Sequence, residues 1–180
     1  MLFDYSREPH SDIAFVDMKS FYASCECVRL GLNPLTTSLC VMSRSDNSAG
    51  LILASSPVFK QVFGKKNVSR SYDLPFDLKT RKFNSYAAKK QGLPTDPAFI
   101  ASIESWAKRT LIVPPRMNAY IQVNMEIQKV FQEFAAPDDI FPYSIDEGFI
   151  DLTSSLNYFI PDSSLSRKEK LDLLSARIQK

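Results

Sequence analysis

The sequence predicts an α+β fold, because strand patterns and helix patterns share one chain of 180 residues. Short apolar runs of strand length lie near both ends, and the later one surrounds Ser-Ile-Asp-Glu-Gly in a predicted β-hairpin. Residues 116–134 instead carry apolar side chains at helical spacing. That stripe comprises Met117, Tyr120, Ile121, Ile127, Phe131 and Phe134. The length suffices for one sizeable core with a smaller subdomain.

The N-terminal part predicts a strand followed by a helix. Residues 11–17 contain Ile-Ala-Phe-Val, a run of the buried-strand type, and end on Asp17. A helix follows with one inward face, and Gly31 and Pro34 end it. The residues of that predicted face are Phe21, Cys25 and Val28.

Two further strands are predicted at residues 39–42 and 51–54, with a polar loop between them. Ser56 and Pro57 then begin a short helix, because serine is a favoured cap and proline a favoured first helical residue. Gly64 ends this helix.

The middle of the chain predicts an irregular connection over residues 74–91. After it, Asp96 and Pro97 begin a helix for the same capping reason. Residues 111–113 are predicted to be extended, since two prolines follow them. A Ser-x-x-Glu capping box at Ser166 introduces the last predicted helix.

Composition excludes some classes of protein. A hydrophobic content of 44% is typical of a globular protein, and no apolar run approaches the roughly 20 residues that span a bilayer. We expect no secretory signal, because the N-terminus lacks an apolar core region. Three cysteines, with a Cys-x-Cys spacing unusual for zinc, favour reduced thiols in the cytoplasm.

Positive charge is concentrated in one third of the chain, although the net charge is only +2. The stretch forms either a solvated face or a surface that contacts phosphates, and charge alone favours neither. Its residues are Lys60, Lys65, Lys66, Arg70, Lys79, Arg81, Lys82, Lys89 and Lys90.

Three acidic residues form a candidate metal site. Asp146 and Glu147 are adjacent in the predicted hairpin turn, where two carboxylates repel each other unless a cation such as Mg²⁺ lies between them. An acidic turn is usually just exposed to solvent, but Asp17 ends an early strand. If the two strands are neighbours, three carboxylates meet at one edge, which suits two divalent ions about 3.5–4 Å apart.

Two contiguous motifs contain the three acidic residues. Residues 16–26 are Val-Asp-Met-Lys-Ser-Phe-Tyr-Ala-Ser-Cys-Glu, and residues 143–153 are Tyr-Ser-Ile-Asp-Glu-Gly-Phe-Ile-Asp-Leu-Thr. The first resembles the first motif of Y-family translesion DNA polymerases, and the second resembles the catalytic Ser-Ile-Asp-Glu motif of that family. Pro-Pro-Arg-Met-Asn-x-Tyr at residues 114–120 resembles the UmuC-like (ImpB/MucB/SamB) branch. The resemblance covers most of the chain and is weakest at residues 79–108.

The resemblance implies a polymerase palm, a ferredoxin-like mixed sheet with helices on one face, with a small fingers insertion. The palm is expected at residues 1–20 and 80–180, and the fingers at residues 21–79. The chain ends before a lysine-bearing segment that relatives carry next. The thumb and the little finger are therefore expected to be absent, and the chain to be an N-terminal fragment.

The family implies a role for each residue of the acidic site. Asp17, Asp146 and Glu147 match the catalytic carboxylates that bind two Mg²⁺ ions. Met18 matches the position whose backbone carbonyl also faces a metal ion. Ser144 fits the motif and is expected either to take part in the site or only to orient the hairpin.

The nucleotide side of the site is implied in the same way. Phe21 lies where the family holds the triphosphate through a backbone N–H, and Tyr22 matches the steric gate that excludes a 2′-hydroxyl. Lys60 is the nearest match to a basic residue that contacts the triphosphate. Ser55 and Ser56 lie where the family lines the nucleotide pocket.

By resemblance, the parent protein adds a deoxynucleotide (dNTP) to a primer 3′ end on primer–template DNA, in SOS-type DNA damage tolerance. A sliding clamp or accessory protein is expected to bind through the missing C-terminal part. The fragment itself is expected to bind Mg²⁺–dNTP weakly and to extend primers poorly. The alternative is a non-catalytic remnant that binds DNA or a protein partner. A palm-fold nucleotide cyclase is disfavoured, since the Gly-Gly-Asp/Glu-Glu-Phe signature is lacking.

Overall fold

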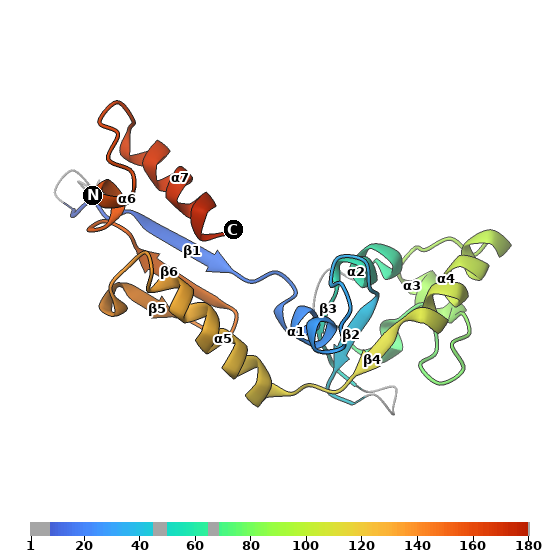
Figure 1. Ribbon diagram of the computed structural model, residues 1–180. Coiled ribbons are helices and arrows are strands. Elements are labelled where there is room, and N and C mark those ends of the chain that lie inside the picture. Colours follow the sequence, from blue (N-terminus) through green and yellow to red (C-terminus); the bar gives the residue numbers. More distant parts are fainter. Residues whose placement is uncertain (1–7, 45–49, 65–68, 180) are drawn as a thin grey trace, which may run out of the picture. The chain divides into compact units, whose positions relative to one another are not determined.

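The computed structural model describes residues 8–44, 50–64 and 69–179 of the chain. It divides into two compact units. The terminal unit consists of Met1–Lys19 and Ile121–Lys180, and the inserted unit consists of Ser20–Tyr120. Both units combine helices with a small sheet, so the predicted α+β class is confirmed (Figure 1).

The terminal unit contains a three-stranded antiparallel sheet in the order β1-β6-β5 (Figure 1). Its strands are β1 (Ile13–Asp17), β5 (Ile140–Pro142) and β6 (Glu147–Asp151). Its helices are most of α5 (Met117–Phe131), α6 (Leu156–Phe159) and α7 (Arg167–Ile178), and a 3₁₀ turn covers Pro137–Asp139. β5 and β6 form the predicted hairpin.

The helices of the terminal unit cover one face of this sheet. Ala14, Val16 and Ile150 point into a core shared with α5, α6 and α7. Ile13 and Phe15 alternate with them and are 50% and 62% exposed. β1 was predicted to be a buried strand, and this is wrong, because Ile13 and Phe15 on the second face of the sheet are exposed.

The inserted unit contains a second sheet in the order β3-β2-β4. β2 pairs antiparallel with β3 and parallel with β4. The strands are β2 (Leu39–Met42), β3 (Ile52–Ser55) and β4 (Leu111–Val113). The helices are α1 (Phe21–Arg29), α2 (Pro57–Phe63), the 3₁₀ turn Ser71–Asp73, α3 (Ser85–Lys90) and α4 (Pro97–Arg109). Aromatic side chains fill its core, with the Phe63 ring 4.8 Å from Phe59 and 4.7 Å from Phe76.

The helix starts predicted from capping residues are confirmed. Ser56 Oγ accepts a hydrogen bond from the Phe59 N–H at 3.3 Å, and Asp96 caps α4 in the same way. Ser166 and Glu169 form the reciprocal capping box of α7. These caps need only residues within one helical turn, which is why the sequence alone reveals them.

Two predictions about helices were wrong. The irregular connection at residues 74–91 contains α3, which is too short to show a periodic apolar pattern. The inward face of α1 is also rotated from the predicted one. Val28 is 68% exposed, whereas Glu26 is only 1% exposed. Hydropathy places a glutamate outside, and only its partners explain its burial.

The predicted division into palm and fingers placed a boundary at residues 79–80. The compact units divide at residues 19–20 and 120–121, with residues 80–120 in the inserted unit. The names palm and fingers for these parts stay predictions. Within residues 8–44, 50–64 and 69–179, none of the helices has the length and apolar character needed to traverse a bilayer.

Candidate active site

Strand pairing brings the three acidic positions of the terminal unit together. Asp17 lies directly opposite Glu147 in the β1–β6 ladder. Directly opposed residues of an antiparallel pair project on the same face, with Cβ atoms about 4.5–5.5 Å apart. The Met18 N–H donates to the Asp146 carbonyl oxygen at 2.9 Å, which extends the contact by one residue. Met18 therefore lies beside the turn that carries Asp146.

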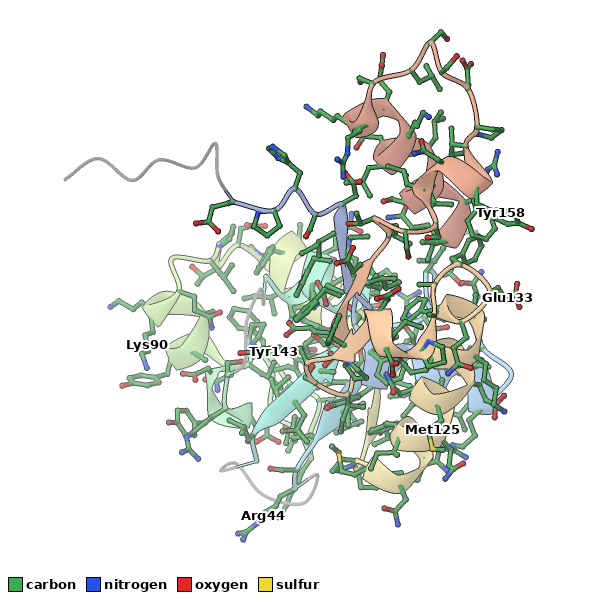
Figure 2. All side chains as sticks on the ribbon, turned by 90° about the vertical axis from the view of Figure 1, so that its left-hand side faces the viewer. Arg44, Lys90, Met125, Glu133, Tyr143 and Tyr158 are labelled. Carbon is green, nitrogen blue, oxygen red and sulfur yellow. The ribbon has the colours of Figure 1, made fainter. Side chains whose placement is uncertain are left out.

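Ser144 organises the turn between β5 and β6. Its hydroxyl oxygen accepts from the N–H groups of Asp146 and Glu147 at 3.3 and 3.1 Å. It also lies 3.2 Å from Asp146 Oδ1. The N–H groups of Tyr143 and Ser144 both donate to the Glu147 carbonyl oxygen at 2.9 Å. Tyr143, labelled in Figure 2, is 74% exposed, so this turn lies at the surface of its unit.

Asn124 also holds this turn, a role that no pattern in the sequence indicates. Its side-chain N–H donates to the Ile145 carbonyl oxygen at 2.7 Å. Asn124 lies on α5, so the hydrogen bond joins the turn to a helix of the terminal unit. A polar residue on a helix is unremarkable in a sequence, and its partner is 21 residues away.

The donor chemistry of this acidic end fits a divalent cation, because Mg²⁺ prefers carboxylate oxygens together with water and phosphate oxygens. Asp17 is exposed, and Asp146 and Glu147 are half-buried. Among the residues that the structure describes, however, no three acidic, histidine or cysteine side chains converge into a group that could hold a metal ion. Like charges separate unless a cation lies between them. Metal binding by these residues stays a prediction.

The start of α1 carries a positive charge from α2. Lys60 Nζ donates to Ser20 Oγ at 3.0 Å. Ser20 is the residue before α1 and has a left-handed backbone with φ of 56°. A helix N-terminus attracts anions, and an ammonium group beside it strengthens the attraction. Phe21 begins the helix with a buried side chain, so its ring belongs to the core.

Ser55 and Ser56 are buried at the end of β3. Ser56 Oγ accepts from the Leu39 N–H at 3.0 Å and donates to the Thr37 carbonyl oxygen at 2.7 Å. Together with the cap of α2, these bonds join the strand, the preceding loop and the helix. They give Ser56 a structural task, and its predicted role in a nucleotide pocket stays a prediction.

Tyr22, the predicted steric gate, stacks on another tyrosine. The rings of Tyr22 and Tyr120 lie 4.6 Å apart between centroids and are inclined by only 10°. Tyr120 is fully buried, whereas Tyr22 is half-buried. Both residues belong to the inserted unit. The sequence predicted Tyr120 on the apolar stripe of its helix, and the family resemblance implied a steric gate at Tyr22, but neither indicated that the two rings touch.

A buried carboxylate holds Tyr120. Glu26 Oε1 accepts from the Tyr120 hydroxyl and from Arg116 Nε, both at 2.9 Å. Arg29 Nε donates to the other carboxylate oxygen at 3.2 Å. We call Tyr22, Glu26, Arg116 and Tyr120 the tyrosine clamp. Sequence reasoning missed it; in retrospect, each of its two pairs is spaced by one helical turn.

Protonation within the tyrosine clamp follows from its surroundings. Burial alone would raise the pKa of Glu26, but hydrogen bonds from Arg116, Tyr120 and Arg29 outweigh burial and lower that pKa below its ordinary value. Burial, together with the hydrogen bond to Glu26, raises the pKa of Tyr120 to about 12. At neutral pH, Glu26 is therefore an anion and Tyr120 a neutral donor.

The basic stretch is partly neutralised by its own unit. Lys82 pairs with Glu104, and Lys90 pairs with Asp73, each at 3.4 Å. Arg81 donates to the carbonyl oxygens of Ala107 and Thr110. These contacts favour a structural role for part of the stretch. Lys65 and Lys66 lie outside the described residues.

Known proteins resemble the chain in both sequence and fold. Residues 83–178, just over half of the chain, match the impB/mucB/samB family. The chain is 37% identical over 150 residues to "Putative UV-damage repair protein UvrX" of Bacillus subtilis (strain 168), a match that covers 83% of this chain and 29% of UvrX. It is 36% identical over 143 residues to "DNA repair protein homolog YozK" of the same organism, covering 79% of this chain and 98% of YozK.

A solved structure supports the fold. The structure described as "Post-insertion binary complex of Dbh DNA polymerase" matches 92% of this chain with a TM-score of 0.54 and 23% identity. The match covers 36% of the Dbh chain. The chain thus spans about a third of UvrX and of Dbh polymerase, and nearly all of YozK.

Proposed function

Because this chain belongs to the impB/mucB/samB family, we propose that it is the catalytic-core fragment of a Y-family translesion DNA polymerase. The reaction proposed for the whole protein is template-directed transfer of a nucleotide from a dNTP to a primer 3′-hydroxyl. It serves DNA damage tolerance of the SOS type in the cytoplasm. The pairing of Asp17 with Glu147 beside the turn at Asp146 carries this proposal.

The acidic end of the terminal unit is proposed to hold two Mg²⁺ ions. Asp17, Asp146 and Glu147 supply carboxylate oxygens, and the Met18 carbonyl supplies a further one. When bound, such ions activate the attacking hydroxyl and stabilise the negative charge on the leaving pyrophosphate. Ser144 and Asn124 hydrogen-bond to the turn that carries Asp146 and Glu147, and they would hold its backbone in place when a cation binds.

The inserted unit is proposed to hold the nucleotide. Lys60 and the backbone at the start of α1, including the Phe21 N–H, would contact the triphosphate. Tyr22 lies in the same first turn of α1, and its ring would pack under the sugar. A 2′-hydroxyl on that sugar would clash with the ring, so the site would favour deoxynucleotides.

Primer–template DNA, a dNTP and a clamp or accessory protein are proposed as partners of the whole protein. The chain spans only 29% of UvrX, so gripping of DNA and contact with a clamp are assigned to parts that this chain does not contain. By itself, the chain is expected to bind Mg²⁺–dNTP weakly and to extend primers poorly.

Equilibrium binding of a fluorescent dNTP to the chain, with and without Mg²⁺, tests the proposal. We expect Mg²⁺ to strengthen binding, and Asp17→Asn to weaken the Mg²⁺-dependent binding by about tenfold or more. Asp138→Asn makes the same change of charge at an exposed position of the same unit and is the matched control. If neither Mg²⁺ nor Asp17→Asn changes the affinity of the chain for the dNTP, the proposal is contradicted.

The similarity to YozK favours a second candidate function, because the chain covers 98% of that short relative. In this alternative the chain is a non-catalytic remnant that binds DNA or a protein. Salt-dependent binding of the chain to duplex DNA, without any Mg²⁺-dependent binding of nucleotide, would favour it.

A further inference from the structure

We infer that Tyr120 is a positioning residue for sugar discrimination, because its ring backs the ring of Tyr22 and the Glu26 carboxylate fixes its hydroxyl. The inference rests on the proposed function, in which Tyr22 is the steric gate. It adds residues that would make the gate rigid. Tyr120 is not proposed to touch the nucleotide.

The rings of Tyr22 and Tyr120 stack directly on each other. A centroid separation of 4.6 Å and an angle of 10° describe stacked rings in contact. Tyr120 is fully buried, so its ring has no free space into which it can turn. Tyr22 is only half-buried, and one of its faces rests on Tyr120. Tyr120, 98 positions further along the chain, therefore supports one face of the Tyr22 ring.

Hydrogen bonds hold Tyr120 in place behind Tyr22. Its hydroxyl donates to Glu26 Oε1 at 2.9 Å, and Arg116 Nε donates to the same oxygen at 2.9 Å. Hydrogen bonds to an ionised acceptor are stronger and better aligned than those between neutral groups. Arg116 also accepts the Tyr120 N–H at its carbonyl oxygen, at 3.2 Å. Tyr120 is therefore fixed at both its backbone and its hydroxyl.

The tyrosine clamp connects two helices. Tyr22 and Glu26 lie one turn apart on α1, and Tyr120 lies in the first turn of α5, four residues after Arg116, which directly precedes that helix. Residues four apart on a helix project from the same side. Each pair thus presents one contact surface to the other. The clamp joins the first turns of α1 to the first turn of α5 within the inserted unit.

A rigid wall is what steric discrimination requires. An aromatic gate excludes a hydroxyl only if the ring cannot move away when the larger sugar enters. Removing the Tyr120 ring leaves space behind Tyr22, so the Tyr22 ring can move away from the sugar. We expect such a change to tighten ribonucleotide binding far more than it alters deoxynucleotide binding.

The test measures dissociation constants of Mg²⁺–dATP and Mg²⁺–ATP for the full chain, by competition against a fluorescent dNTP. In Tyr120→Leu, we expect the ratio of the ATP constant to the dATP constant to fall about tenfold, mainly through tighter ATP binding. In Tyr120→Phe, the ring remains but its hydrogen bond to Glu26 is lost, so we expect the ratio to fall by only about threefold. A fall as large as that in Tyr120→Leu would mean that the hydroxyl matters and the ring does not.

Phe83→Leu is the matched control, because it removes one ring of the Phe83–Phe99 pair in the same unit. It should lower the melting temperature without changing the ratio. If Tyr120→Leu does not fold, Glu26→Gln keeps the inference testable, since the loss of charge should loosen Tyr120 and lower the ratio about threefold.

The results distinguish failure of the Tyr120 positioning role from failure of the proposed steric gate at Tyr22. If the unaltered chain binds ATP and dATP equally, the gate fails, and this inference fails with it. If the unaltered chain discriminates and folded Tyr120→Leu or Glu26→Gln discriminates equally well, the steric gate survives and only the positioning role is overturned.

Discussion

The acidic end of the terminal unit and the tyrosine clamp of the inserted unit are organised in opposite ways. Asp17, Asp146 and Glu147 are exposed or half-buried, and their side chains do not converge. Glu26 is buried, accepts three hydrogen bonds and holds a stacked pair of rings. At the acidic end, hydrogen bonds hold mainly the backbone, whereas in the tyrosine clamp they hold the side chains themselves.

The difference teaches which kind of site a protein can complete without its ligand. A buried carboxylate needs donors, and the inserted unit supplies them from Arg29, Arg116 and Tyr120. At the acidic end, Asp146 Oδ1 accepts from the exposed Ser144 hydroxyl at 3.2 Å, and neighbouring carboxylates repel one another unless a cation lies between them. A shape-selective wall can be built in advance, whereas a cation site of this kind is completed by the cation.

Glu26→Ala, in the tyrosine clamp, should lower stability more than any variant at the acidic end. It leaves the Tyr120 hydroxyl and Arg116 without their acceptor, and we expect the free energy of unfolding to fall by about 3 kcal/mol. Urea denaturation followed by far-UV circular dichroism measures it. Glu126→Ala is the control, because Glu126 pairs with Lys129 on the surface, where little change is expected. Equal stability of the two variants would mean that the clamp contributes nothing.

Gly148→Ala tests the fixed backbone of the acidic end. A Cβ at this position would lie 3.1 Å from the Phe141 carbonyl oxygen and 3.5 Å from Pro142 Cα. Both are backbone atoms of β5, so the hairpin must open slightly, and we expect a loss of about 1–2 kcal/mol in unfolding free energy. Mg²⁺-dependent dNTP binding should weaken as well. A variant as stable as the unaltered chain would show that the hairpin has room to adapt.

Ser144→Ala should have a smaller effect in the same region. It removes the acceptor for the N–H groups of Asp146 and Glu147, which we expect to cost about 1 kcal/mol in the free energy of unfolding. Thermal melts measure this loss. Ser154→Ala is the matched control, since it removes an exposed hydroxyl that contacts Asp139. A loss no larger than that of the control would assign the turn geometry to Asn124 and the backbone alone.

The pH dependence of stability should show the smallest effect, and Glu26 should contribute to it. Its pKa in the folded protein is lowered, so its contribution to stability is present above its unfolded pKa of about 4.3. The contribution is lost as the pH falls through the lower, folded value. Urea titrations between neutral and acidic pH should therefore show a loss that is smaller in Glu26→Gln. An identical pH profile for both chains would contradict this assignment.

Much of the local structure could be predicted from the sequence. The hairpin around Asp146 and Glu147, the caps at Ser56 and Ser166 and the long helix α5 all follow from patterns within a few residues. The candidate acidic residues were also identified from sequence, because their motifs are contiguous. Short α3 and the exposed face of β1 were missed, since neither leaves a periodic signal.

The sequence by itself determined where the chain turns and where its helices begin, because short-range contacts decide these features. Only the tertiary structure decided that β1 pairs with β6 and that Glu26 is buried beneath Tyr120. Glu26 lies 90 residues from Arg116 and 94 from Tyr120. A charged side chain becomes a buried one only when distant donors replace its water, and no local pattern records which donors those are.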